Sequence, residues 1–203
     1  MQTGTDLIAA ARIAVAGVAL TPVRSGSRWS ERDRRAGDIV ARVAAAAAAG
    51  LSPDRVVVLR RPGAPPLALA AGRRRRLHIS LSLTHRLGRA LAAAAPAGTR
   101  VGIDLEREGV VPAGAERLFM ADAERPLLDR HDAAAIWALK EAAWKALALP
   151  AWLPFSALRL RVDADGDVVA VETPDVREAA RATLWSPWPR FVAALVWTMP
   201  EAA

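Results

Sequence analysis

The chain has 203 residues, enough for one large domain or two small ones with a substantial core. It contains no cysteine, which excludes disulfides, thiolate metal ligands and a cysteine nucleophile, and its three histidines argue against a histidine-rich zinc site. The net charge of +7 favours acidic partners, such as nucleic acid, a membrane surface, a phosphorylated cofactor or an acidic protein, unless the arginines serve only solubility.

The N-terminal stretch 7–20 is apolar but shorter than the roughly 20 residues that a membrane helix needs. Asp6 precedes it, Arg12 interrupts it and no basic segment leads it, so it does not fit a signal peptide. We expect residues 12–20 to form a first strand, and we expect a cytoplasmic protein without membrane contact.

A long helix is predicted next. Ser30 is a suitable N-cap with acids in the following turn, and the alanine-rich stretch ends at Gly50. Ile39 and Val43 lie four residues apart, on one face of this helix. Strands are predicted over residues 56–59, 67–71, 78–83 and 89–95.

The second half begins with a predicted strand over residues 100–105 and a short helix over 122–128. Asp132 caps a longer helix, 133–149, that ends at Pro150. The remaining predicted strands are 158–163 and 167–171, which flank the turn Asp165-Gly166, then 182–185 and 191–197.

The order helix, hairpin, strand, strand therefore occurs twice, although residue identity between the halves is low. We expect an α+β fold of two similar, pseudo-symmetric lobes, each a long helix on a small, mainly antiparallel sheet. The predicted lobes are residues 1–98 and 99–203, with the active site in the cleft between them.

Carboxylates suggest a metal site in the second lobe. Asp104 and Glu106 are two residues apart on a strand and so point to the same face, with Leu105 behind them. Like charges placed together repel unless a cation neutralises them, and Mg²⁺ prefers carboxylate oxygens. Glu141 could complete the site or act as a general base. A strand end with solvated acids is the alternative.

Lysines accompany Glu141 on the predicted helix. Lys145 lies four residues after Glu141, which by itself indicates an ordinary helix-surface ion pair. Trp137 and Trp144 lie one turn on either side of Lys140, which favours a partly buried surface where the glutamate needs a partner. Lys145 could then neutralise a phosphate or protonate a leaving group.

Two basic segments could bind anions. Residues 82–86 (SLTHR) place a hydroxyl, an imidazole and a guanidinium at a strand end, and 73–76 are four successive arginines. A polar turn and a solvated loop are the alternatives. Nothing else indicates nucleic-acid binding.

Together these segments resemble the 4′-phosphopantetheinyl transferase superfamily, whose hallmark is G-(I/V)-D-x-E followed by W-x-x-K-E-x-x-x-K. Here the two motifs read GIDLE at 102–106 and WALKEAAWK at 137–145, and RLFMADAE at 117–124 resembles the R-F-F-(S/T)-x-x-E segment between them. The resemblance is strongest over residues 72–150.

The resemblance implies a magnesium-dependent transferase that moves 4′-phosphopantetheine from coenzyme A to a serine of an acyl or peptidyl carrier protein. Asp104, Glu106 and Glu141 would hold Mg²⁺. Glu141, Lys145 and Asp104 would be catalytic, Glu141 as the base and Lys145 beside the departing adenosine 3′,5′-bisphosphate.

The cofactor side is also implied by the resemblance. Thr84 and His85 match a Ser-His pair whose histidine contacts the 3′-phosphate of coenzyme A, and Arg73 matches a basic residue just before that strand. Lys140 and Lys145 would contact phosphate, although Lys140 could serve only the helix. Arg86 replaces a small residue of the family, which would crowd the pocket or strengthen phosphate binding.

The length and the repeated order resemble the long, monomeric type that activates polyketide and nonribosomal peptide synthetases. The alternatives are a degenerate homologue that binds carrier proteins without catalysis and a metal-dependent nucleic-acid enzyme.

Overall fold

The structure is a computed structural model, and it describes residues 11–19, 29–61, 64–72, 75–163, 165, 167–175 and 177–198. In the N-terminal half the elements are β1 (Ala14–Ala19), α2 (Trp29–Ala49), η1 (Pro53–Arg55), β2 (Val56–Leu59), β3 (Leu67–Ala70), β4 (Arg75–Arg76), β5 (Ile79–Arg86) and β6 (Arg89–Pro96). In the C-terminal half they are β7 (Val101–Arg107), η2 (Ala115–Leu118), η3 (Asp122–Asp129), α3 (Ala133–Leu147), η4 (Phe155–Ala157), β8 (Arg159–Val162), β9 (Val168–Glu172), β10 (Arg177–Trp188) and β11 (Phe191–Thr198).

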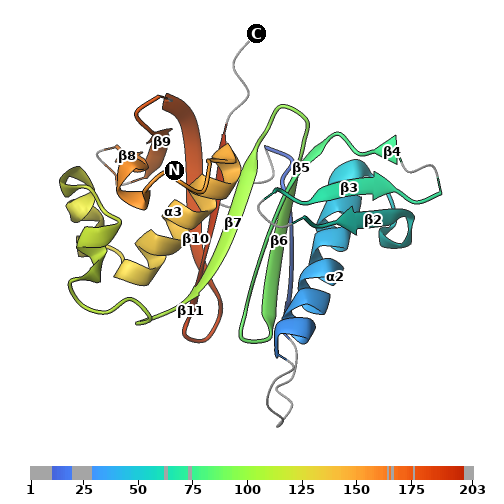
Figure 1. The fold of residues 1–203 in the computed structure, drawn as a ribbon, viewed down its shortest axis with the longest axis horizontal. Helices are drawn as coiled ribbons and strands as arrows, with labels where there is room; N and C mark the ends of the chain where they lie inside the picture. The colour runs from blue at the N-terminus through green and yellow to red at the C-terminus, as the bar shows by residue number, and fades with distance from the viewer. Residues whose placement is uncertain are drawn as a thin grey trace.

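The expected α+β class with antiparallel sheets is confirmed. Within the described residues the strands form three sheets, with orders β1-β6-β5, β7-β11-β10-β9-β8 and β2-β3-β4, and every pair there is antiparallel. Helix α2 packs on β5 and β6, and helix α3 packs on β7 and β11. In Figure 1 the β1-β6-β5 sheet and strands β7, β10 and β11 of the five-stranded sheet lie between the two helices, with α3 on one side and α2 on the other.

Strand alternation explains this layering, because successive side chains of a strand point to opposite faces. In β6, Leu91, Ala93 and Ala95 join a core shared with β7 and β11, whereas Ala90, Ala92 and Ala94 join the core under α2. In β7, Ile103 and Leu105 point into the shared core. The residues between them, Gly102, Asp104 and Glu106, are left for the opposite face, as expected for the two acids.

Helix α2 differs from the prediction in its buried face. The helix begins at Trp29, one residue before the expected cap, and ends before Gly50, whose φ is +65°. Its core face consists of small side chains and Val40, and the predicted apolar pair Ile39 and Val43 is 51% and 41% exposed. Alanines are common all round this helix, so hydrophobic spacing alone did not identify the face that packs closely.

Helix α3 begins as predicted: the side chain of Asp132 accepts a hydrogen bond of 2.8 Å from Ala135 N. The helix ends at Leu147, and Ala148 adopts a left-handed conformation with φ +52°.

The short helix predicted over 122–128 is present as η3, of the tighter 3₁₀ type. Within the described residues, no helix is long and apolar enough to span a membrane.

Candidate active site at the junction of two sheets

The β1-β6-β5 sheet meets the five-stranded sheet where hydroxyl groups of β5 form hydrogen bonds with the edge of β7. Strand β7 pairs with β11 along one edge, and its other edge faces β5 without backbone pairing. Ser80 Oγ accepts a hydrogen bond of 3.0 Å from Val101 N, and Ser82 Oγ accepts one of 3.0 Å from Ile103 N. Next along β5, Thr84 Oγ1 donates to Asp104 Oδ1 at 3.1 Å. These contacts satisfy the free strand edge and fix Asp104 beside β5.

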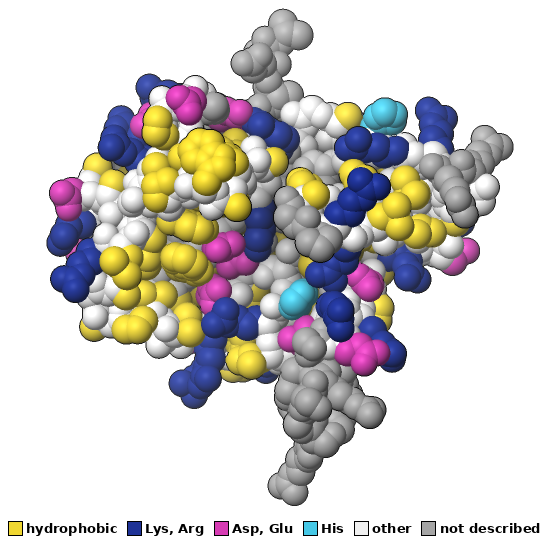
Figure 2. Space-filling view, viewed as in Figure 1, with side chains coloured by type: hydrophobic (Ala, Val, Ile, Leu, Met, Phe, Trp, Pro, Cys, Tyr) yellow, Lys and Arg dark blue, Asp and Glu magenta, His cyan; other side chains and the backbone are white. Residues whose placement is uncertain are grey.

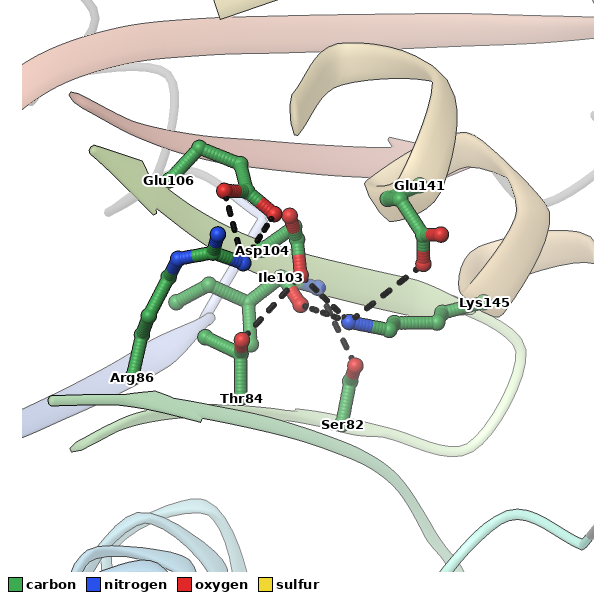
Figure 3. Close-up of polar contacts among 8 residues, drawn as sticks. All are labelled: Ser82, Thr84, Arg86, Ile103, Asp104, Glu106, Glu141 and Lys145. Atoms are coloured by element: carbon green, nitrogen blue, oxygen red, sulfur yellow. Dashed lines mark hydrogen bonds and ion pairs between the residues drawn. The ribbon is translucent and has the colours of Figure 1, made fainter. Parts of the chain in front are cut away.

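Helix α3 lies directly on β7 because of Gly102. A Cβ at this position would be 1.8 Å from Ala142 O and 2.6 Å from Ala146 N, so any larger residue would push the helix away. This close approach brings Glu141 and Lys145, on the same helix face, over the acids of β7. Figure 3 shows the four side chains converging at the end of β7.

The ammonium of Lys145 is central to this group. Its Nζ lies 2.6 Å from Asp104 Oδ1, donates to Ile103 O at 3.2 Å and lies 3.9 Å from Glu141 Oε2. The expected helix pair between Glu141 and Lys145 is therefore present, but the shorter contact crosses to β7.

Glu106 has a different cation. Arg86 Nη1, from the end of β5, donates to Glu106 Oε1 at 3.1 Å and lies 2.9 Å from Oε2. Asp104 and Glu106 are only 5% and 7% exposed. Even so, Asp104 Oδ2 accepts no hydrogen bond, and Glu106 Oε2 has only the ion-pair contact with Arg86.

Burial raises the pKa of two glutamates of the site, Glu106 and Glu141. Burial, and then the charge of Asp104, raise the pKa of Glu106 to about 7, and Arg86 only partly offsets this. Burial also raises the pKa of Glu141, with Lys145 opposing and Asp104 reinforcing the shift. Arg86 and Lys145 therefore only partly offset the burial of these two glutamates.

Carboxylate oxygens suit a hard divalent cation such as Mg²⁺, and one of them, Asp104 Oδ2, is buried and accepts no hydrogen bond. The three carboxylates are not already arranged around one point. Among the described residues, no three His, Cys, Asp or Glu side chains form a metal-binding group, and the Lys145 ammonium lies between Asp104 and Glu141. The donor chemistry fits a metal, and the side chains would have to adjust around it.

A basic cavity of about 630 Å³ adjoins the acids. Its wall includes Arg60, Arg61, Thr84, His85 and Lys145, with Trp144 on the side of α3. Figure 2 shows acidic side chains near the centre of this face, between hydrophobic surface over the C-terminal half and several Lys and Arg side chains over the N-terminal half. The arrangement places positive charge beside the acidic cluster.

His85 points away from the acids, on the opposite face of β5 from Thr84. Its Nε2 is 3.4 Å from Arg60 Nη2, and burial followed by the charge of Arg60 lowers its pKa. An anion in this part of the cavity would meet both side chains.

Lys140 requires a correction. Its side chain is 0% exposed, and its Nζ forms an ion pair of 2.7 Å with Glu124. It also donates to the carbonyls of Phe119, Phe155 and Leu158. Because no surface of Lys140 remains for a phosphate, we do not retain it among the cofactor-binding residues, and its contacts are structural.

The arginine run is only partly described. Arg73 and Arg74 lie outside the described residues, so the predicted phosphate contact of Arg73 stays a prediction. Arg75 and Arg76 form the exposed strand β4, which pairs with β3, where a solvated loop was one alternative.

Arg60 and Arg61 in the cavity wall were not among the residues predicted from the sequence. A signal was available, because both follow directly on a β-branched strand and precede Pro62-Gly63. A second, largely apolar cavity of about 530 Å³ on the other side of the acids was not predicted either. That cavity is lined in part by Arg86, Glu106, Leu118, Phe119 and Trp137.

Comparison with known proteins gives this geometry a family context. Residues 100–196 match the family model of the 4′-phosphopantetheinyl transferase superfamily. The match runs from β7 to β11 and includes Asp104, Glu106, Glu141 and Lys145. The resemblance to this superfamily is thereby confirmed for that part of the chain.

Two solved structures are similar to about half of the chain. The Thermotoga maritima holo-[acyl-carrier-protein] synthase has a TM-score of 0.40 and 25% identity, over 50% of this chain and 64% of that chain. A Chronobacterium ammoniagenes ACPS–CoA complex has a TM-score of 0.37 and 18% identity, over 51% of this chain and 98% of that chain. The match thus spans less than two thirds of the Thermotoga chain. No curated protein matches the sequence.

Proposed function

We propose that this protein transfers the 4′-phosphopantetheine group of coenzyme A to a serine hydroxyl of an apo acyl or peptidyl carrier protein. The observation that carries the proposal is the convergence of Asp104 and Glu106 from β7 with Glu141 and Lys145 from α3, beside a basic cavity. The match of residues 100–196 to the transferase superfamily supports it.

Coenzyme A would lie in the basic cavity. His85 on β5 would face its 3′-phosphate, together with Arg73 and with Arg60, which is already beside His85. Thr84, on the other face of β5, would line the part of the cavity next to Asp104. The pyrophosphate would then extend toward Lys145. Charge complementarity supports this placement, since the 3′-phosphate would meet Arg60 and the pyrophosphate would meet Lys145.

Asp104, Glu106 and Glu141 would hold Mg²⁺, which would neutralise pyrophosphate charge when bound. The buried oxygen Asp104 Oδ2, which accepts no hydrogen bond, supports that assignment.

The chain's own residues would act in the transfer. Glu141 would accept the proton of the serine hydroxyl, and its raised pKa suits a base that works near neutral pH. The serine oxygen would attack the phosphorus that bears pantetheine. The bond from that phosphorus to the bridging oxygen would break, and adenosine 3′,5′-bisphosphate would leave with the electron pair. Lys145, held at this place by Asp104, would stabilise the leaving phosphate.

The carrier protein would approach from the apolar cavity on the other side of the acids. Leu118 there is 74% exposed, and the chain's positive charge would attract an acidic carrier domain. We propose carriers of polyketide and nonribosomal peptide synthetases. We also propose that the chain works as a monomer of two lobes, 1–98 and 99–203, because each half contributes one helix packed on one large sheet.

Intact-mass spectrometry tests the proposal directly. Apo carrier proteins of the fatty acid, polyketide and nonribosomal peptide types would each be incubated with the protein, coenzyme A and MgCl₂. The expected result is a gain of one phosphopantetheine that EDTA abolishes. No gain on any carrier, with coenzyme A still bound, would indicate a non-catalytic homologue; no coenzyme A binding at all would contradict the proposal.

A further inference from the structure

Arg86 forms an ion pair that the transfer reaction does not use. It ends β5 on the same face as Ser82 and Thr84, and its guanidinium reaches Glu106 on β7, with Nη1 at 3.1 Å from Oε1 and 2.9 Å from Oε2. Figure 3 shows it approaching the acids from the side opposite Lys145.

The two acids of β7 thus have separate internal cations. Lys145 neutralises Asp104 from helix α3, and Arg86 neutralises Glu106 from strand β5. Both acids are almost fully buried, so a cation inside the protein stabilises their charged forms where water does not reach.

A divalent cation at these carboxylates would meet the guanidinium. The Arg86 nitrogen is already within contact of both oxygens of Glu106, and two cations at one carboxylate repel each other. The Arg86 side chain is 38% exposed and lines the apolar cavity, so it has open space into which it can move.

We propose that Arg86 is a resident counter-cation of Glu106, which a divalent metal ion must displace from the carboxylate. This inference rests on the proposed metal site. Arg86 is a positioning residue: it holds Glu106 in place while the metal is absent, and its competition weakens metal binding before coenzyme A arrives. The metal affinity of the free protein is therefore set partly by a residue of the N-terminal half.

The test is the affinity of the full chain for Mg²⁺ without coenzyme A. Arg86→Gln removes the charge but keeps an N–H donor for Glu106. Thermal unfolding is followed in EDTA and at increasing MgCl₂ concentrations, and Mg²⁺ binding is measured by calorimetry. We expect half-saturation at an Mg²⁺ concentration about tenfold lower for Arg86→Gln than for wild type, because one opposing charge is gone. The Mg²⁺-induced rise in Tm should also be larger.

Arg42→Met is the matched control, since it removes one exposed positive charge of helix α2, and its Mg²⁺ affinity should equal that of wild type. In a Glu106→Gln background, Arg86→Gln should no longer change the affinity. Where Arg86→Gln does not fold, Arg86→Lys and Arg86→Met provide the charged and neutral pair.

Equal or weaker Mg²⁺ binding by the neutral variants, with wild type still responding to Mg²⁺, would overturn the role of Arg86 alone. If neither wild type nor any variant responds to Mg²⁺, the proposed metal site itself is wrong, and this inference with it.

Discussion

Thr84 Oγ1 donates a hydrogen bond to Asp104 Oδ1, and Lys145 Nζ lies 2.6 Å from that same oxygen. One carboxylate oxygen therefore joins strand β5, strand β7 and helix α3. A change in any of the three elements moves the others, so the site depends on how the two halves pack as well as on its own residues.

Lys145→Ala should lower kcat by about 10²–10³-fold, because the leaving phosphate loses a preorganised positive charge. The measurement is steady-state transfer to a carrier protein. Lys145→Arg is the control, since it restores the charge with a different shape and should recover part of the activity. Kinetics unchanged in Lys145→Ala would leave Lys145 with only its structural contacts to Asp104 and Glu141.

Glu141→Gln should reduce transfer by about 10²–10⁴-fold, the range typical of a lost general base. The fold should persist, since Glu141 is half-buried at the cleft and glutamine has the same shape. Circular dichroism is the control for folding and should be unchanged, and coenzyme A binding measured in EDTA, where no metal takes part, should be retained. Near-normal turnover would contradict the role of Glu141 as the base.

Gly102→Ala should destabilise the protein by at least about 1–3 kcal/mol, as overpacking does in a tight core. The added Cβ would lie 1.8 Å from Ala142 O and 2.6 Å from Ala146 N. Both are backbone atoms of helix α3, which cannot move aside as a flexible side chain could. Gly37→Ala in helix α2 is the matched control: its Cβ would have ordinary contacts of 3.4–3.5 Å, so stability should stay equal or rise. Denaturant unfolding measures both, and an unchanged midpoint for Gly102→Ala would argue against the close packing of α3 on β7.

Lys140→Met should cost about 3–5 kcal/mol, because it leaves Glu124 charged, buried and without its cation. The double variant Lys140→Met/Glu124→Gln should recover part of this loss. Coenzyme A affinity of the folded protein should not change. A specific loss of coenzyme A affinity at unchanged stability would reinstate Lys140 as a phosphate contact.

How far the sequence predicts this structure varies with the scale of the interaction. The alternation of β7 and the cap at Asp132 are local, so the same-face placement of Asp104 and Glu106 and the start of α3 were predictable. The burial of Lys140 was not predictable, because the adjacent residue Glu141 faces the cleft while Lys140 faces the core.

The arginine partners of Glu106 and His85 could not be predicted from local sequence patterns either. Arg86 reaches Glu106 and Arg60 reaches His85 only because the sheets pack as they do, across 20 and 25 residues of chain. Alanines also conceal the buried face of α2, since they fit either side of a helix.

Stability without metal should depend on pH through Glu106. Its pKa is raised from 4.5 to about 7 in the folded protein, so between these values the folded state binds more protons than the unfolded state. The free energy of unfolding therefore falls as pH rises through this window, and the loss is complete above about pH 7.

Glu106→Gln carries no such charge, so its Tm should rise relative to wild type as the pH increases. Thermal unfolding of both proteins in EDTA at several pH values measures the difference, and MgCl₂ should reduce it at high pH by stabilising the wild-type carboxylate. A difference in Tm that stays constant with pH would show that Glu106 is already ionised at the low end of the range, and that Arg86 neutralises it more completely than its burial suggests.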